Sequence, residues 1–265
     1  MAFVTGLTFV LGLFVGSFLN VCIWRLPREE QVVRGRSHCP ACGVTIRWYD
    51  NIPLASFVLL GRRCRQCRAP ISWRYPAVEL LTGLALAAVV GRWGMTGPAL
   101  VYGALLCGLI VTSFIDAREQ IIPDGITLPG TALGVLASVV WPALHGRQSH
   151  WGGLGPSVLG AVVGGGATYL MGLLGQWMFK KEAMGGGDVK LMAMLGAVLG
   201  WQRVLVTFLI APILGSLVGV PLRILKGVDL IPYGPFLAVA AAIALWWGRP
   251  IVAWYAHALM GVGAG

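Results

Sequence analysis

Two aspartates beside apolar segments are the residues of this sequence best placed to do chemistry. Asp116 closes the apolar run Ile110–Ile115, and Asp188 follows three consecutive glycines, Gly185–Gly187. A carboxylate at the edge of such a segment is costly unless it functions or pairs. Two nearby carboxylates share one proton, so that one acts as a base on a water while the other donates to a carbonyl oxygen. The pair therefore predicts peptide hydrolysis without a metal.

Helix capping is the structural alternative for these acids. Asp is common at a helix N-terminus, where it accepts backbone N–H groups. Capping fits Asp188, and it also fits Asp124, which follows a proline. It does not fit Asp116, which stands at the end of its apolar run, so we interpret Asp124 as a helix cap or orienting residue and keep Asp116 and Asp188 as the catalytic pair.

The neighbours of Asp188 are expected to support it. Gly185 and Gly187 carry no side chains, so an extended substrate backbone could lie beside the acid. Lys190, two residues further on, either favours the ionised acid through its charge or extends to the membrane interface.

A second candidate site consists of two Cys-x-x-Cys pairs separated by 21 residues. Each two-residue spacer lets both thiolates face one ion, which is typical of a tetrahedral zinc site. Because four thiolates fill the coordination sphere, the zinc would be structural. Disulfides or free thiols are the alternative, but disulfides are disfavoured in a cytoplasmic loop. The predicted ligands are Cys39, Cys42, Cys64 and Cys67.

These cysteines stand in a loop, Arg25–Pro76, that carries ten arginines and several aromatic residues. Arginines interleaved with Trp and Tyr suit base stacking, and they equally suit anionic headgroups and lipid. We favour the membrane and expect no nucleic-acid partner.

The composition indicates lipid as the solvent, since 57% of the 265 residues are hydrophobic and only 11% are charged. Soluble domains have roughly 45–50% and about 25%. The first apolar run, Thr5–Trp24, has no cleavage site and is expected to be a retained helix. We predict an all-α polytopic membrane protein of about eight transmembrane helices, with centres near Leu13, Ala85, Cys107, Leu133, Gly166, Leu195, Ile213 and Ala242.

The charge distribution sets the expected topology. With the arginine-rich loop in the cytoplasm, sixteen of the twenty Lys and Arg residues fall on the inside, and both termini fall outside. Asp116 and Asp188 then share the cytoplasmic face. The span after Asp188 is short, so a tilted or half span is possible there. The expected domains are a first helix (1–24), a zinc-stabilised cytoplasmic loop domain (25–76) and a transmembrane peptidase domain (77–265).

A transporter with an acidic ion path is the alternative from another functional class. It predicts acids near the bilayer midplane and an inverted repeat. The aspartates instead cluster at one face, and the sequence has no recognisable inverted repeat.

The segments Asp116–Asp124 and Gly185–Leu191 resemble the paired aspartate motifs of bacterial type IV prepilin peptidases, the second being their Gly-x-Gly-Asp signature. Further similar segments extend from the first helix to the last: Gly16–Val21, Arg25–Pro27, Tyr49–Pro53, Gly61–Cys64, Arg74–Thr82 and Pro232–Leu237.

The resemblance implies a bifunctional enzyme of the bacterial inner membrane. Such enzymes cut the basic leader from type IV prepilins or type II secretion pseudopilins, then methylate the new N-terminus with S-adenosylmethionine. Asp116 and Asp188 match the catalytic aspartates, and the four cysteines match those of the methylation-associated loop. Glu79 is implicated less securely, either in binding the cofactor or the new amine, or in pairing with an arginine such as Arg74.

Overall fold

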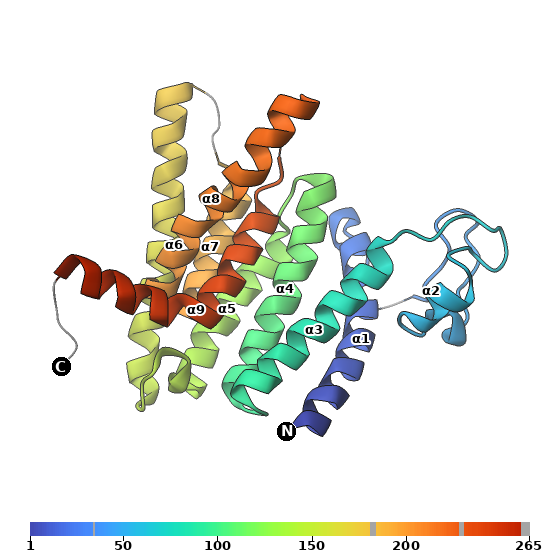
Figure 1. The fold of residues 1–265 in the computed structure, drawn as a ribbon, viewed down its shortest axis with the longest axis horizontal. Coiled ribbons are helices and arrows are strands. Elements are labelled where there is room, and N and C mark those ends of the chain that lie inside the picture. The colour runs from blue at the N-terminus through green and yellow to red at the C-terminus, as the bar shows by residue number, and fades with distance from the viewer. Residues whose placement is uncertain (34, 181–183, 228–230, 261–265) are drawn as a thin grey trace. The chain divides into compact units, whose positions relative to one another are not determined.

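The computed structural model describes residues 1–33, 35–180, 184–227 and 231–260. Within these ranges the structure is helical, apart from turns and two isolated β-bridges (Figure 1). The chain divides into two compact units, Met1–Ile115 and Asp116–Gly265. The long helices are α1 (Ala2–Arg25), α3 (Arg74–Trp93), α4 (Gly97–Glu119), α5 (Asp124–Val140), α6 (His150–Phe179), α7 (Gly186–Leu199), α8 (Trp201–Lys226) and α9 (Gly234–Met260).

All eight predicted span centres lie inside helices, one in each of these eight. Among the described residues, six helices are long and apolar enough to cross a membrane, namely α1, α3, α4, α6, α8 and α9. The other two are shorter, with 17 residues in α5 and 14 in α7. The sequence therefore predicted the eight helices correctly. Six of them have the length of a full membrane span, and α5 and α7 are shorter.

In the first unit, α1 and α3 lie side by side, and the cysteine-bearing loop connects them (Figure 1). Small residues allow this close approach. A Cβ atom added to Gly12 would lie 2.7 Å from the Cα of Gly83, and one added to Gly16 would lie 2.6 Å from the Cα of Glu79. Backbone contact of this kind is how helices associate in lipid, where no hydrophobic driving force brings them together.

The cysteine-bearing loop contains only short elements, the 3₁₀ turns η1 (Leu26–Arg28) and η2 (Trp48–Asn51) and the helix α2 (Ala55–Leu59). Arg25, at the end of α1, ties the first part of the loop down. Its buried guanidinium donates to the carbonyl oxygens of Gln31, at 2.9 Å, and Arg36, at 3.4 Å.

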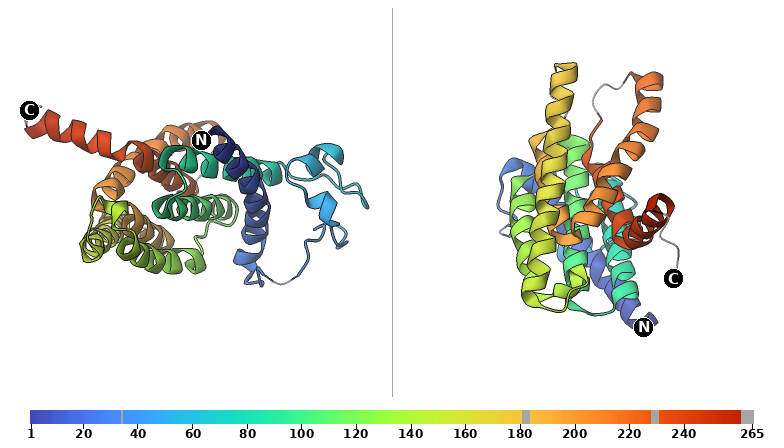
Figure 2. Two further views of the ribbon diagram at one scale, coloured as in Figure 1. Left: turned by 90° about the horizontal axis from the view of Figure 1, so that it is seen from below. Right: turned by 90° about the vertical axis from the view of Figure 1, so that its left-hand side faces the viewer.

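In the second unit, α5, α6 and α7 pack against one another (Figure 2). Gly160 of α6 and Gly196 of α7 face each other so closely that neither has room for a Cβ atom. The hydroxyl of Ser157 donates a buried hydrogen bond of 2.7 Å to the carbonyl of Ala197 across the same interface. The two glycines thus let α6 and α7 pack backbone against backbone.

The two short helices, α5 and α7, each reverse the direction of the chain, as the long helices do. Lys190, in the first turns of α7, binds Asp124 at the start of α5. The chain must therefore leave this end of the unit along α5 and return to it along α6. At 1.5 Å per residue, α5 spans about 25 Å and α7 about 21 Å, less than the roughly 30 Å of a hydrocarbon core. The short span predicted after Asp188 is α7, which ends at Gly200, where φ is +82°.

Candidate active site

Asp116 lies in the last turn of α4, with only 6% of its surface exposed. A buried carboxylate there is disfavoured by the helix dipole, so it needs donors from elsewhere. One donor is the backbone N–H of Gly234, which binds Oδ2 at 2.7 Å. Gly234 is the first residue of α9, so two helices far apart in the sequence meet at this carboxylate.

Glycine is required at position 234 by this contact. A Cβ atom there would lie 2.8 Å from Oδ2 of Asp116 and 3.1 Å from its Cβ. No ordinary side chain fits that space, because real Cβ atoms essentially never approach so closely.

Asp188 is the third residue of α7 and is half-buried. Its carboxylate accepts the backbone N–H of Gly185, the N-cap of the helix. Its own N–H donates to the carbonyl of Gly185 at 3.1 Å. A side chain at the third helical position that accepts the N–H of the N-cap makes one of the two hydrogen bonds of a capping box. The capping interpretation is therefore satisfied for Asp188, and capping leaves the second carboxylate oxygen available.

The structure brings the two aspartates together. The charge of Asp116 acts on the carboxyl group of Asp188, and both acids belong to the second unit. Each lies at a helix end, and neither is in the middle of a helix. The ion path of a transporter, with acids near the midplane, is not supported by this placement.

Tyr233 completes the group. Burial and the negative charge of Asp188 raise the pKa of this tyrosine to about 12, so its hydroxyl stays protonated at neutral pH. Tyr233 and Gly234 are consecutive, so one dipeptide binds Asp116 and lies within the electrostatic influence of Asp188. Sequence reasoning missed these two roles, although Pro232–Leu237 was among the segments of resemblance.

Asp124 and Lys190 form an ion pair, with Nζ at 2.8 Å and 2.7 Å from the two carboxylate oxygens. Asp124 is the first residue of α5, and Pro123 is the N-cap. Of the two interpretations of Asp124, helix cap or orienting residue, the interhelical ion pair agrees with the second. Lys190 in turn binds this acid, a partner that the sequence analysis did not anticipate.

Gly187 makes a second contact between the start of α7 and the segment before α5. A Cβ atom there would lie 2.9 Å from the Cβ of Ile122, in the turn between α4 and α5. Gly185 and Gly186 are both exposed; a Cβ atom at Gly185 would lie 3.5 Å from Oδ2 of Asp188, and one at Gly186 would meet nothing within 4 Å. The glycine triplet therefore packs at its last residue and leaves open backbone at its first two.

The four predicted zinc ligands also come together, in the first unit. All four Sγ atoms lie within 4.8 Å of one another, and those of Cys39 and Cys67 are 3.9 Å apart. Tetrahedral zinc with Zn–S bonds of roughly 2.3 Å spaces its sulfurs roughly 3.8 Å apart. The donor set therefore fits zinc. None of the six cysteines forms a disulfide in the structure.

The two cysteine pairs are held by the same backbone pattern, 25 residues apart. Cys39 N–H donates to the carbonyl of Val44, and Cys64 N–H donates in the same way to Ala69, with distances of 2.9 Å and 2.8 Å. Each first cysteine also accepts the N–H of the residue four positions on, Gly43 or Arg68. Both of those residues have positive φ, +71° and +60°. The second knuckle thus uses arginine where the first uses glycine.

Glu79 lies on α3 and is buried, with 8% of its surface exposed. Its Oε2 accepts the backbone N–H of Leu54 at 2.9 Å, and the hydroxyl of Ser17 is a second hydrogen-bond partner. The proposed partner Arg74 instead places its guanidinium over the ring of Tyr75. Glu79 therefore connects the loop to α1 and α3.

The chain matches two family models, the bacterial peptidase A24 N-terminal domain over residues 10–93 and the type IV leader peptidase family over residues 103–220. The prepilin leader peptidase/N-methyltransferase of Pseudomonas putida is 39% identical over 281 residues, which cover 95% of this chain and 93% of that protein. The protein of the same name from Pseudomonas aeruginosa is 38% identical, with 94% and 92% covered. The chain belongs to the type IV leader peptidase family.

Another relative with this name, from Myxococcus xanthus, is 44% identical over 222 residues. That match covers 83% of this chain but only 63% of the relative, so the chain spans less than two thirds of that protein. Among solved structures, none matches with significance.

The two family matches divide the candidate residues between them. The four cysteines and Glu79 fall within the A24 N-terminal match, and both aspartates fall within the leader peptidase match. Tyr233 and Gly234 lie beyond residue 220 and outside both matches. The structure, and not the two family matches, thus relates Tyr233 and Gly234 to the acids.

Proposed function

We propose that this protein cleaves the basic leader from type IV prepilins or type II secretion pseudopilins and then methylates the new N-terminal amine. Family membership and the names of the relatives support this activity. The observation that carries it is the meeting of Asp116 and Asp188 at one end of the second unit. We propose that these two acids are the catalytic pair.

In the proposed mechanism the two interacting acids share one proton, so that one carboxylate is ionised and the other protonated. The ionised acid takes a proton from water as the water oxygen bonds to the scissile carbonyl carbon. The protonated acid donates to the carbonyl oxygen. When the C–N bond breaks, the leaving amine takes the proton held by the first acid and the second acid regains its own, which restores the starting state.

The surroundings of Asp116 and Asp188 differ, which suits the different roles of an ionised and a protonated acid. Asp116 is buried and fixed by Gly234 N–H, whereas Asp188 is half-buried and capped at one oxygen. We propose that the exposed backbone of Gly185 and Gly186 receives the extended substrate beside Asp188. Asp124 and Lys190 would hold the ends of α5 and α7 together and so keep Asp188 in place.

We propose that the four cysteines bind one structural zinc ion. Their thiols would order a loop that has little apolar core of its own. With all four positions filled by sulfur, zinc leaves no place for a reacting water, and it takes no part in cleavage.

Methylation needs a donor, and we propose S-adenosylmethionine. Glu79 does not fit a contact with its ammonium group, because the carboxylate is buried and bound to Leu54 and Ser17. We propose that Glu79 instead positions the loop, and we assign no residue of this chain to the donor.

The proposed location is the inner membrane of a bacterium, with the cysteine loop and both aspartates at the cytoplasmic face. A leader rich in Lys and Arg stays in the cytoplasm while the following apolar helix lies in the bilayer. The scissile bond then lies at the interface, at the depth proposed for the two acids.

The test uses purified full-length protein and a synthetic peptide that joins a basic leader to an apolar helix. Mass spectrometry should find the leader released at a single bond, and the mature helix gaining one methyl group only when S-adenosylmethionine is added. An intact peptide after long incubation would contradict the proposal.

A further inference from the structure

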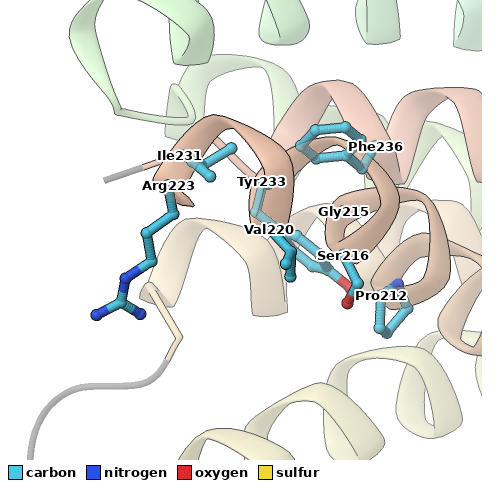
Figure 3. A pocket seen from close by; sticks show the side chains of 9 residues that line it. Pro212, Gly215, Ser216, Val220, Arg223, Ile231, Tyr233 and Phe236 are labelled. Atoms are coloured by element: carbon cyan, nitrogen blue, oxygen red, sulfur yellow. The ribbon is translucent and has the colours of Figure 1, made fainter. Parts of the chain in front are cut away.

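A groove of about 430 Å³ runs along α8 beside the candidate active site (Figure 3). Gly215, Ser216 and Gly219 form its floor on α8, and Ile231, Tyr233 and Phe236 form the facing wall. The two rings lie over the floor, since a Cβ atom added to Gly215 would lie 3.7 Å from both. Three turns of α8, from Pro212 to Arg223, border the groove, a length of about 16 Å.

Tyr233 joins this groove to the two acids. Its ring lines the groove, and the negative charge of Asp188 acts on its hydroxyl. The next residue, Gly234, donates its N–H to Asp116. The groove is therefore connected to the two acids through Tyr233 and its neighbour Gly234.

The lining indicates the kind of ligand. Most of it is apolar, and of the described lining residues Arg223 alone is charged and none is acidic. A cofactor with a sulfonium and an ammonium group would find no acidic side chain among these lining residues. Both helices that form the groove, α8 and α9, are long and apolar enough to cross a membrane. The lining therefore suits an apolar ligand that enters from a bilayer.

We infer that this groove binds the first turns of the substrate's apolar helix, immediately after the scissile bond. The inference rests on the proposed function, because only that reaction supplies a substrate with an apolar helix next to the cut. Gly215 and Gly219 let side chains of this chain pack on α8, since a Cβ atom added to Gly219 would lie 2.9 Å from Cδ1 of Ile231. The substrate helix would lie on these apolar side chains and on the exposed Ser216.

Two neighbouring residues on α8 give a matched test. Ser216 lies in the groove and is exposed, and Leu217, 67% exposed, does not line it. Ser216→Trp fills the groove without displacing a buried side chain, whereas Leu217→Trp adds an indole outside it. In cleavage of the synthetic prepilin peptide, Ser216→Trp should raise KM at least about tenfold with kcat little changed, because binding is lost in ground and transition states alike. Leu217→Trp should stay within about twofold of the wild type.

Crosslinking provides a second measurement that does not depend on tolerance of tryptophan. With the photoreactive residue p-benzoylphenylalanine at position 216, the enzyme in phospholipid nanodiscs should capture the apolar part of the peptide, and at position 217 it should capture lipid. An unchanged KM for Ser216→Trp, or capture of lipid alone at position 216, would overturn the inference. If the wild-type enzyme fails to cut the peptide, it is instead the proposed function that fails.

Discussion

At the scale of single residues, the two acids depend on backbone N–H groups. Gly234 binds Asp116, and Gly185 binds Asp188. Such donors are fixed by the helices that carry them, so each carboxylate is held in a preorganised position before substrate arrives. The side-chain space around them is as important as the donors, because Gly234 touches the carboxylate it binds.

Gly234→Ala tests this preorganisation. The new methyl group would lie 2.8 Å from Oδ2 of Asp116, so the carboxylate must move. A displacement of about 1 Å at a reacting group can cost about 10²-fold in rate, and we expect a loss of that order in kcat. Gly155→Ala is the control, since a Cβ there meets nothing within 4 Å. Equal cleavage by the two variants would show that Asp116 needs no such positioning.

The sequence predicted the two acids but not what holds them. Asp116 and Asp188 were recognisable because acids beside apolar runs are rare and costly. Gly234 is 118 residues from Asp116 along the chain, and no local pattern signals a contact at that separation. The partner of Lys190 was unpredictable for the same reason, being 66 residues away, and the nearer acid Asp188 was the natural expectation.

At the scale of elements, the ends of α5 and α7 are joined by two different contacts. Gly187 packs on Ile122 just before α5, and Lys190 binds Asp124. The ion pair is partly exposed, with 41% and 54% of the two side chains accessible, so water screens it. The pair therefore contributes orientation more than stability.

A double-mutant cycle measures that contribution. Lys190→Met and Asp124→Asn should each lower the cleavage rate by less than about tenfold, and the double variant should be no worse than either single one, because one interaction is lost in all three. Additive losses would mean that the two side chains act separately, and the pairing would have no role in cleavage.

The cysteine knuckles are the other element that carries a specific expectation. Metal analysis of the purified protein should find about one zinc per chain, and Cys39→Ser should reduce it to near zero, because a three-thiolate site holds zinc poorly. Cys107→Ser, in α4, should keep its zinc.

The same variants separate the two activities. Cys39→Ser should lose methylation and retain cleavage, because both acids lie in the other compact unit. Wild-type protein purified without metal would contradict the zinc assignment.

The helices and the cysteine cluster were predictable because a local sequence pattern determines each of them. Apolar runs identified every long helix, and Cys-x-x-Cys spacing identified the metal cluster. The contacts of the cysteine loop were not predictable, since Glu79 binds a backbone N–H that no sequence pattern marks. Arg68 likewise takes a positive φ at which glycine stands in the first knuckle.

At the scale of the whole molecule, the proposed topology requires that successive helices run in opposite directions. In the second unit, α5 leaves the end that bears the acids and α6 returns to it, although α5 is short for a span. The charge distribution then predicts that the loop before α6 lies outside and the end of α4 inside.

Cysteine labelling in spheroplasts tests this topology. Ser149 precedes α6 and Glu119 ends α4, and both are exposed. Ser149→Cys should react with a membrane-impermeant maleimide in intact spheroplasts, and Glu119→Cys only after permeabilisation. Labelling of both positions from the same side would exclude a crossing by α5.

The most direct test of the central claim is cleavage of the prepilin peptide by Asp116→Asn and Asp188→Asn, compared with Glu119→Gln as an exposed acid of the same segment. Each Asp→Asn change removes a group that must gain and lose a proton, so either should lower kcat by about 10²- to 10⁴-fold. Glu119→Gln should cut like the wild type. Cleavage retained by either aspartate variant would contradict the assignment of Asp116 and Asp188 as the catalytic pair.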